Sequence, residues 1–252
     1  MRIKVVFNVK KNLILPLHYN HLIQKNIYDI LDLDYGSFLH DEGYKYLNRS
    51  FKLFTFSKLV VENKEVLKDK IIIKNGQVNL TISTIDERFI FSLIRGFIKR
   101  KKFIFKEGEL DIEAVYAKKD LKFNKLVALT ISPVVVKKSS EDNKDDFYTI
   151  EDELFVEKIK ENLLKKYYAY YNKDYDGELM LEILDKDKTK KVVDFYKKYP
   201  YEGYLAGFVI KGRHDIIDVA YSCGLGNKNS QGFGCIEKID EINKFNNYIR
   251  VL

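Results

Sequence analysis

The sequence has few of the residues from which metal centres are built. Its 252 residues include two cysteines, Cys223 and Cys235, and four histidines. No CxxC pair or His/Cys spacing is typical of a zinc site, and the shortage of cysteine indicates a reducing compartment. No uninterrupted apolar run approaches the ~20 residues of a membrane span, and residues 1–7 lack the long apolar segment of a signal peptide. We therefore expect a cytoplasmic protein with no metal, no cofactor and no membrane partner.

Acidic residues are outnumbered by basic ones. The chain has 44 Lys and Arg against 37 Asp and Glu, a formal net charge of +7 and a pI of about 9.0. This excess favours a polyanion such as nucleic acid as a partner. Three basic clusters, at residues 99–102, 118–119 and 137–138, would extend a phosphate-binding track. For each of them, a solvated protein surface is the simpler interpretation.

The order of the expected elements repeats once along the chain. Alternating and β-branched runs predict strands, and apolar residues at helical spacing predict helices. In the first half we expect strands at 2–9, 51–61, 71–74, 77–83, 103–105 and 110–116, with helices at 18–33 and 86–99. The pair Asn75-Gly76 predicts a hairpin turn between two of these strands. In the second half we expect strands at 126–136, 177–184, 191–195, 204–210 and 234–239, with helices at 151–171 and 214–222.

Each half therefore follows the order β-α-β-β-α-β, which is the ferredoxin-like arrangement. The fold class predicted is α+β, with two tandem ferredoxin-like (RRM-like) domains at residues 1–120 and 121–252. No low-complexity linker separates the halves, so we expect them to pack against each other.

A glycine-rich stretch near the end of the chain is the strongest sign of a binding site. Residues 224–234 read Gly-Leu-Gly-Asn-Lys-Asn-Ser-Gln-Gly-Phe-Gly. Glycine permits positive φ and close approach of a backbone to a ligand, and such a loop can turn several N–H groups toward one anion. It lacks the Gly-Lys-Ser/Thr of a Walker loop, and a plain glycine-rich hairpin is the alternative. We predict phosphate binding by Gly224, Gly226, Asn227, Lys228, Asn229, Ser230, Gly232 and Gly234.

One histidine lies where a catalytic group is expected. His40 follows Phe38-Leu39 in a loop flanked by glycines, whereas capping or packing explains His18, His21 and His214. RNA cleavage without a metal needs a base, an acid and a donor or cation for the phosphorane. Imidazole can supply the first two, lysine suits the phosphate charge, and tyrosine is a donor. The elements around His40 would bring Tyr28 and Lys52 to it.

The chain resembles the CRISPR repeat-processing endoribonucleases of the RAMP superfamily over nearly its whole length. The resemblance rests on four stretches: the glycine-rich residues 224–234; Leu-Pro-Leu-His-Tyr-Asn-His-Leu-Ile-Gln at 15–24, followed by Ile27-Tyr28; Phe-Leu-His-Asp at 38–41 with Lys-Leu-Phe-Thr-Phe-Ser at 52–57; and Leu-Thr-Ile-Ser-Pro-Val at 129–134. One departure is visible, because Lys25 and Asn26 stand where many members have glycine after the glutamine.

The resemblance implies a tandem ferredoxin-like fold and metal-independent cleavage inside the repeat by attack of the 2′-hydroxyl. The products would be mature crRNA with a 5′-hydroxyl and 2′,3′-cyclic phosphate ends. The Tyr/His/Lys site of the family falls on Tyr28, His40 and Lys52. The implied partners are CRISPR repeat RNA or precursor crRNA and other subunits of CRISPR effector complexes, with a homodimer left open.

Two other functions remain open from the sequence. The chain could be a non-catalytic RAMP subunit that binds RNA within a CRISPR ribonucleoprotein, because the same glycine-rich loop would serve it. It could also be a nucleotide-binding regulatory domain of ferredoxin-like type. Binding of an RNA backbone should weaken steeply with salt, whereas binding that is flat from low to high salt would favour the regulatory domain.

Overall fold

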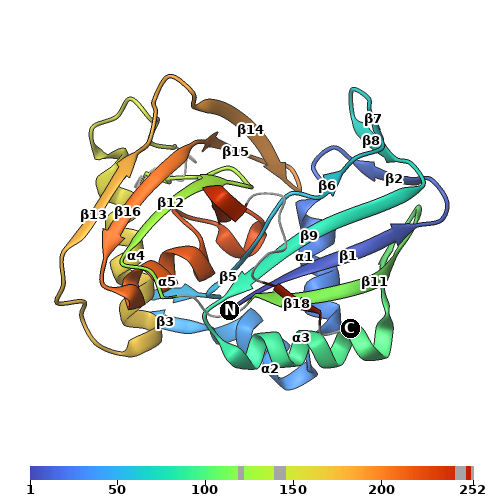
Figure 1. Ribbon diagram of the computed structural model, residues 1–252, viewed down its shortest axis with the longest axis horizontal. Helices are drawn as coiled ribbons and strands as arrows, with labels where there is room; N and C mark the ends of the chain where they lie inside the picture. The colour runs from blue at the N-terminus through green and yellow to red at the C-terminus, as the bar shows by residue number, and fades with distance from the viewer. Residues whose placement is uncertain (119–121, 139–145, 242–247, 251–252) are drawn as a thin grey trace.

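Two antiparallel sheets lie side by side in the computed structural model, which describes residues 1–118, 122–138, 146–241 and 248–250 (Figure 1). The first sheet has the strand order β10-β11-β1-β9-β5, with β6 also paired to β9 and β18 to β11. Its strands are β1 (Arg2–Val9), β5 (Phe54–Phe56), β6 (Val60–Val61), β9 (Gly76–Thr84), β10 (Lys102–Phe105), β11 (Gly108–Lys118) and β18 (Tyr248–Arg250).

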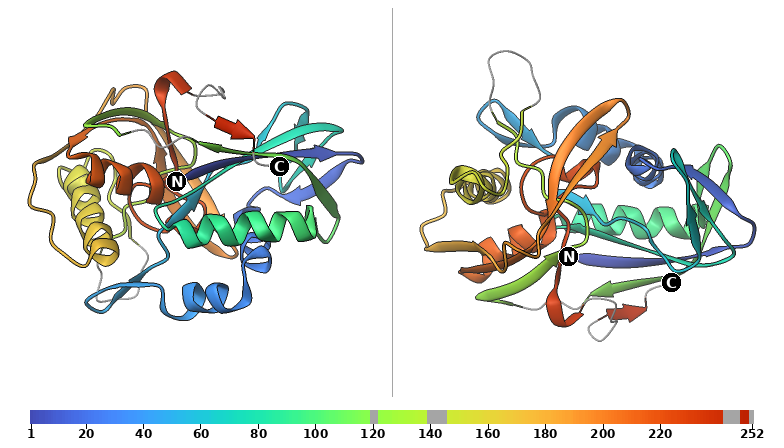
Figure 2. Two further views of the ribbon diagram at one scale, coloured as in Figure 1. Left: turned by 60° about the horizontal axis from the view of Figure 1, so that its bottom comes forward. Right: turned by 90° about the horizontal axis from the view of Figure 1, so that it is seen from above.

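Two helices cover one face of this sheet, α1 (Asn20–Ile30) and α3 (Glu87–Arg100), as Figure 2 shows. The side chain of Asp86 caps α3 by accepting a hydrogen bond from the backbone N–H of Arg88 at 2.9 Å. The apolar residues that predicted these helices, among them Ile23, Ile27, Phe89 and Leu93, are buried against the sheet. The four strands β11-β1-β9-β5 with α1 and α3 therefore form a ferredoxin-like unit.

The second sheet repeats this plan with the order β13-β16-β12-β17. Its strands are β12 (Lys125–Thr130), β13 (Leu179–Ile183), β16 (Gly207–Gly212) and β17 (Ile236–Lys238), and its helices are α4 (Leu154–Tyr171) and α5 (His214–Cys223). The predicted tandem ferredoxin-like architecture is thus confirmed. The expected boundary near residue 120 stays a prediction, and the last strand, β18, pairs back with β11 of the first sheet.

Short elements complete the described structure. One small sheet joins β2 (Leu13–Pro16), β7 (Lys64–Val66) and β8 (Lys70–Ile73), and two hairpins are formed by β3 (Tyr44–Tyr46) with β4 (Arg49–Phe51) and by β14 (Lys190–Tyr196) with β15 (Tyr199–Leu205). Short helical segments are α2 (Leu33–Ser37), the π-helix η1 (Phe38–Glu42), and the 3₁₀ turns η2 (Asn229–Gln231) and η3 (Ile239–Glu241). In the part of the chain that the structure describes, no helix combines the length and apolarity needed to cross a bilayer.

Four predictions about strands are wrong. The expected strand 126–136 ends at Thr130, before Pro133. The pair Asn75-Gly76 does not close a hairpin, because β8 pairs with β2 and β7 whereas β9 pairs with β1, β5 and β6. Gly76 has a φ of 139°, far from the value of a tight hairpin turn, so the chain passes here from one sheet to another. The expected strand 51–61 is interrupted at Leu53, which has a φ of 50°. The expected strand 204–210 divides into the end of β15 and the start of β16, which belong to different sheets.

A buried ion pair joins the two halves of the chain. Arg2 on β1 and Glu237 on β17 lie 3.1 Å apart with both side chains almost fully buried. Burial raises the pKa of the Glu237 carboxyl, but Arg2 and Lys118 outweigh burial and lower it. Because breaking such a pair leaves a buried charge uncompensated, it holds the two sheets in one arrangement.

Candidate functional site

The three predicted catalytic residues come together on one side of the molecule. Tyr28 lies on α1, His40 in η1 and Lys52 between β4 and β5. The ring centroids of Tyr28 and His40 are 6.2 Å apart in an edge-on arrangement. Lys52 Nζ donates a hydrogen bond to the backbone oxygen of His40 at 2.8 Å. The structure thus places a hydroxyl, an imidazole and an ammonium group in one neighbourhood.

His40 is the most accessible of the three, with 78% of its side chain exposed. Its Nδ1 lies 2.7 Å from Oδ1 of Asp41, which is also exposed. A carboxylate can only accept, so in the neutral ring this bond holds the proton on Nδ1 and leaves Nε2 as a base. Water screens this exposed pair, so its effect on reactivity is small.

Partial burial shifts the pKa values of Tyr28 and Lys52 in opposite directions. Burial raises the pKa of the Tyr28 phenol, so the hydroxyl keeps its proton and acts as a donor. Burial lowers the pKa of the Lys52 ammonium, and the nearby Asp41 carboxylate partly offsets this effect. Of the three, only His40 can serve as the base, whereas the other two can donate to a phosphate.

The glycine-rich loop is more tightly folded than an open cradle of amides. Six of its backbone N–H groups donate to protein carbonyl oxygens: Gly224 to Ala220, Leu225 to Gly234, Asn227 to Val135, Gln231 to Lys228, Gly232 to Asn229 and Gly234 to Pro133. The backbone amides that were expected to face an anion therefore mostly donate hydrogen bonds to the protein itself. The RNA-binding role of the loop stays a prediction. What it offers a ligand is a row of half-buried side chains, Asn227, Lys228, Ser230 and Gln231.

Close backbone packing explains two of the glycines. Gly234 has a φ of 70°, and a Cβ there would lie 2.0 Å from the backbone oxygen of Leu225. Gly226 has a φ of 65°, and a Cβ there would lie 2.4 Å from the backbone oxygen of Val135. Residues with a Cβ rarely adopt this conformation, and neither oxygen can move without breaking the loop.

Side chains from both halves of the chain hold the loop by its carbonyl oxygens. From α4, Lys166 Nζ donates to Gly224 at 2.7 Å and to Gly226 at 3.0 Å. From α1, Asn20 Nδ2 donates to Gln231 and Gly232, and Gln24 Nε2 donates to Ser230 at 2.8 Å. Within the loop, Asn229 Nδ2 donates to Leu225 and Phe233. The loop is thus fixed at the junction of the two ferredoxin-like units.

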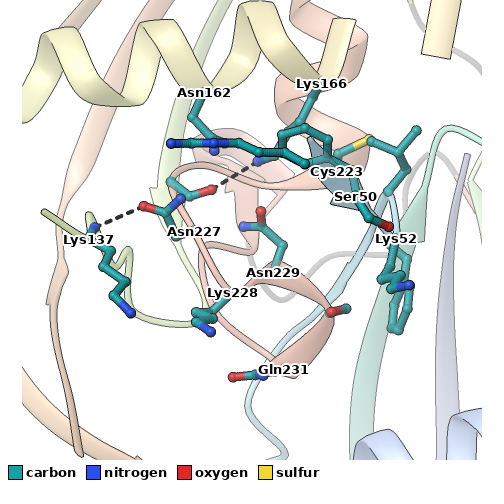
Figure 3. Close-up of a pocket in the computed structure, with 16 residues that line it drawn as sticks. Ser50, Lys52, Lys137, Asn162, Lys166, Cys223, Asn227, Lys228, Asn229 and Gln231 are labelled. Carbon is teal, nitrogen blue, oxygen red and sulfur yellow. Dashed lines mark hydrogen bonds between the residues drawn. The ribbon is translucent and has the colours of Figure 1, made fainter. Parts of the chain in front are cut away.

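A pocket of about 460 Å³ lies between this loop, the segment 49–54 and α4 (Figure 3). Five basic residues line it and no acidic residue does, among the residues that the structure describes; the basic ones are Arg49, Lys52, Lys137, Lys166 and Lys228. Lys137 belongs to one of the predicted basic clusters, whereas Lys119 of another lies outside the described residues. Such a concentration of one charge attracts an anion and raises its local concentration.

Of the three predicted catalytic residues, only Lys52 lines this pocket. Tyr28 and His40 line a neighbouring hollow of about 570 Å³ together with Asp29, Asp32 and Asp41. Lys52 lines the basic pocket and bonds to His40, so it connects the two. Because carboxylates repel anions, the side of Lys52 is the more favourable approach to His40 for a negatively charged ligand.

Several residues of this site were missed by the sequence analysis. Asn162 and Lys166, one turn apart on α4, both line the pocket and interrupt a buried apolar stripe that includes Phe155, Ile159 and Leu163. Polar residues at these positions of an otherwise apolar helical stripe could have indicated the site from the sequence. Asn20 gave no signal of its own. His18 has a partner that the sequence did not suggest, Asp194 Oδ1 at 2.6 Å from its Nδ1.

The buried ammonium of Lys166 predicts a dependence of stability on pH. Burial lowers the pKa of Lys166 from 10.5 to about 7. Between these two values the unfolded chain holds a proton that the native chain has lost, so the free energy of unfolding should rise with pH across this window. Lys166→Met should flatten this rise, as urea unfolding from pH 6 to 10 would measure. An unchanged slope in Lys166→Met would show that another group is responsible.

The comparisons with known proteins point to one family over nearly the whole chain. The family model described as CRISPR-associated protein Cas6, N-terminal, matches residues 14–115, and the model described as CRISPR associated protein Cas6, C-terminal, matches residues 116–238. The CRISPR-associated endoribonuclease Cas6 1 of Methanocaldococcus jannaschii is 28% identical over 260 residues, covering 99% of this chain and 97% of the relative. The CRISPR-associated endoribonuclease-like protein Cas6nc of Pyrococcus horikoshii is 30% identical over 251 residues, covering 95% and 100%.

Solved structures show the same similarity. One described as CRISPR associated protein Cas6 has a TM-score of 0.77 and 26% identity, covering 95% of this chain and 99% of that one. Another, described as an RAMP protein binding different RNA substrates, has a TM-score of 0.78 and 26% identity, with the same coverage.

Proposed function

We propose, because this chain belongs to the Cas6 family of CRISPR-associated proteins, that it is a metal-independent endoribonuclease that cuts CRISPR repeat RNA in precursor transcripts. The 2′-hydroxyl at the cut site attacks the adjoining phosphate, giving a 5′-hydroxyl and a 2′,3′-cyclic phosphate. The observation that carries the proposal is the position of Lys52, which lines the basic pocket and bonds to His40.

In this reaction His40 handles the proton transfers, and Lys52 and Tyr28 act on the phosphate. His40 Nε2 removes the 2′-hydroxyl proton, and the resulting imidazolium can return a proton to the leaving 5′-oxygen. Lys52 places positive charge beside the phosphorane, where charge develops in the transition state. Tyr28 donates a hydrogen bond that orients the phosphate, because its raised pKa keeps the phenol protonated.

Single-turnover cleavage of the repeat RNA from the protein's own locus, in EDTA, tests the proposal. We expect cleavage at one position, and we expect a 2′-deoxy substitution at the nucleotide before that position to abolish it. Cleavage that continues on the 2′-deoxy substrate would contradict attack by the 2′-hydroxyl. Cleavage that requires added Mg²⁺ would contradict the metal-independent part.

The proposal also covers the cellular location of the protein and its partners. It places the protein in the cytoplasm, with precursor crRNA as substrate and with other CRISPR effector-complex subunits as receivers of the cut RNA. The sequence left a homodimer open, and light scattering of the purified protein with and without RNA would decide it.

A non-catalytic RNA-binding subunit is the second candidate. The relative with 30% identity, named endoribonuclease-like, favours it, and the basic pocket would serve it equally. Tight binding of repeat RNA that is recovered intact after long incubation would support this function over the nuclease.

The basic pocket predicts a steep dependence of RNA binding on salt. Each phosphate contact to a single strand adds about 0.7 to the slope of log K against log salt, so Lys228→Ala should reduce that slope by about this amount. The matched control is Lys106→Ala, whose side chain is 94% exposed in the turn between β10 and β11, away from the pocket. A flat salt dependence of the wild type would instead favour a site for a small nucleotide.

A further inference from the structure

Asn162 lies at a position where a polar side chain does not stabilise the fold. Only 6% of it is exposed, and it stands on the buried face of α4 beside Ile159 and Leu163. Its Oδ1 is buried and has no hydrogen-bond partner among the described residues. A buried polar atom without a partner destabilises a protein, and native structures contain few of them. An apolar residue here would be more favourable for folding alone.

Asn162 shares its pocket with a planar cation and an aromatic ring. Asn162 lines the basic pocket, and Figure 3 shows it extending from α4 toward the loop above Asn227. Arg49 and Phe51 of β4 line the same pocket and provide a planar guanidinium and a ring. Proteins that read single-stranded RNA stack unpaired bases on such groups and hydrogen-bond to their edges.

We propose that this pocket receives one unpaired adenine of the repeat RNA and that Asn162 reads it. The inference rests on the proposed function, because the repeat RNA is the ligand. A carboxamide matches adenine with two hydrogen bonds, in which its oxygen accepts from the N6 amino group and its NH₂ donates to N7. Because Oδ1 of Asn162 has no hydrogen-bond partner among the described residues, it is available to accept from the N6 amino group.

Along the edge that carries N6 and N7, the same chemistry distinguishes adenine from the other bases. Guanine presents two acceptors, O6 and N7, along this edge, so the carboxamide oxygen would face another oxygen. Pyrimidines have no N7. The phosphates on either side of the adenine would meet the cations of the pocket, Lys52, Lys137 and Lys228. Since Lys52 also contacts His40, the adenine is expected close to the cut site.

The test measures affinity for repeat RNA in which each unpaired adenine is replaced, one at a time, by 7-deazaadenine, which lacks N7. It uses His40→Ala protein, so that cleavage does not interfere. At one position near the cut site, we expect about tenfold weaker binding, the size expected for a base contact of this kind. The same substitution should have no effect in His40→Ala/Asn162→Leu protein.

Three readouts separate the possible failures. Asn162→Leu should keep or raise the melting temperature, because it removes an unpartnered buried amide; a clear fall would show that Asn162 is structural and overturn the inference. The inference would also be overturned if 7-deazaadenine lowered RNA affinity equally in proteins with and without Asn162, or if it lowered affinity at no position. Wild-type protein that binds repeat RNA without cutting it would contradict the nuclease activity, yet the 7-deazaadenine result would still decide the role of Asn162.

Discussion

Replacing His40 by alanine is expected to slow cleavage of repeat RNA by about 10²–10⁴-fold, the usual contribution of general acid–base catalysis. His40 is the residue whose imidazole nitrogen can accept the 2′-hydroxyl proton, since the phenol of Tyr28 stays protonated and Lys52 is a donor. The side chain is largely exposed and packs against little except the edge of Tyr28. The fold should therefore be unaffected, and single-turnover rates at saturating enzyme would isolate the chemical step.

A second histidine provides the control for this prediction. His214, the first residue of α5, is exposed and stands outside the pocket that His40 borders. His214→Ala should cleave at the wild-type rate, and both variants should bind RNA with wild-type affinity. If His40→Ala cuts as fast as the wild type, His40 is not the base.

Replacing Gly234 by alanine is expected to lower the free energy of unfolding on the order of 3 kcal/mol, because positive φ is unfavourable for alanine and the new Cβ would meet a backbone oxygen. That oxygen, of Leu225, lies 2.0 Å from the position of the Cβ. The loop would have to open, which would separate Lys228 from the rest of the basic pocket. Repeat RNA affinity should consequently fall more than tenfold, as urea unfolding and RNA titration of the same preparation would show.

Gly76→Ala separates the effect of an unfavourable backbone φ from the effect of a steric clash at the new Cβ. Gly76 also has a positive φ, of 139°, but nothing lies within 4 Å of a Cβ built there. This variant should lose less stability than Gly234→Ala and should bind RNA like the wild type, because Gly76 is remote from the loop. Equal effects of the two substitutions would mean that φ alone, rather than the close approach to Leu225, makes glycine necessary at Gly234.

The sequence predicted the fold well where local patterns agree with burial. The strand Arg2–Val9 and the helix after Asp86 begin and end almost where their residues indicate, because an apolar run and a capping side chain act locally. The hairpin at Asn75-Gly76 was wrong for the opposite reason. A pair such as Asn-Gly indicates the backbone conformation of two residues only. The choice of a partner strand depends on contacts with residues far away in the chain.

The site was predicted in part. His40 was proposed from its glycine-flanked loop, and Tyr28 and Lys52 from the neighbouring elements and from the family resemblance; the structure brings the three near one another. The buried side chains that fix the loop, Lys166 and Asn20, act on backbone oxygens more than 50 residues away in the chain. No spacing rule predicts such contacts, since they depend on how the two ferredoxin-like units pack. The glycines themselves proved to be needed for close packing, which a sequence pattern does not distinguish from ligand binding.

The chemistry of the RNA ends tests the central claim most directly. Repeat RNA from the protein's own locus would be incubated with the wild-type protein in EDTA, and the termini of both fragments would be identified by mass spectrometry. The account predicts a 5′-hydroxyl on the downstream fragment and a 2′,3′-cyclic phosphate on the upstream fragment. A 5′-phosphate with a free 3′-hydroxyl would contradict it, because water rather than the ribose would then have attacked the phosphate.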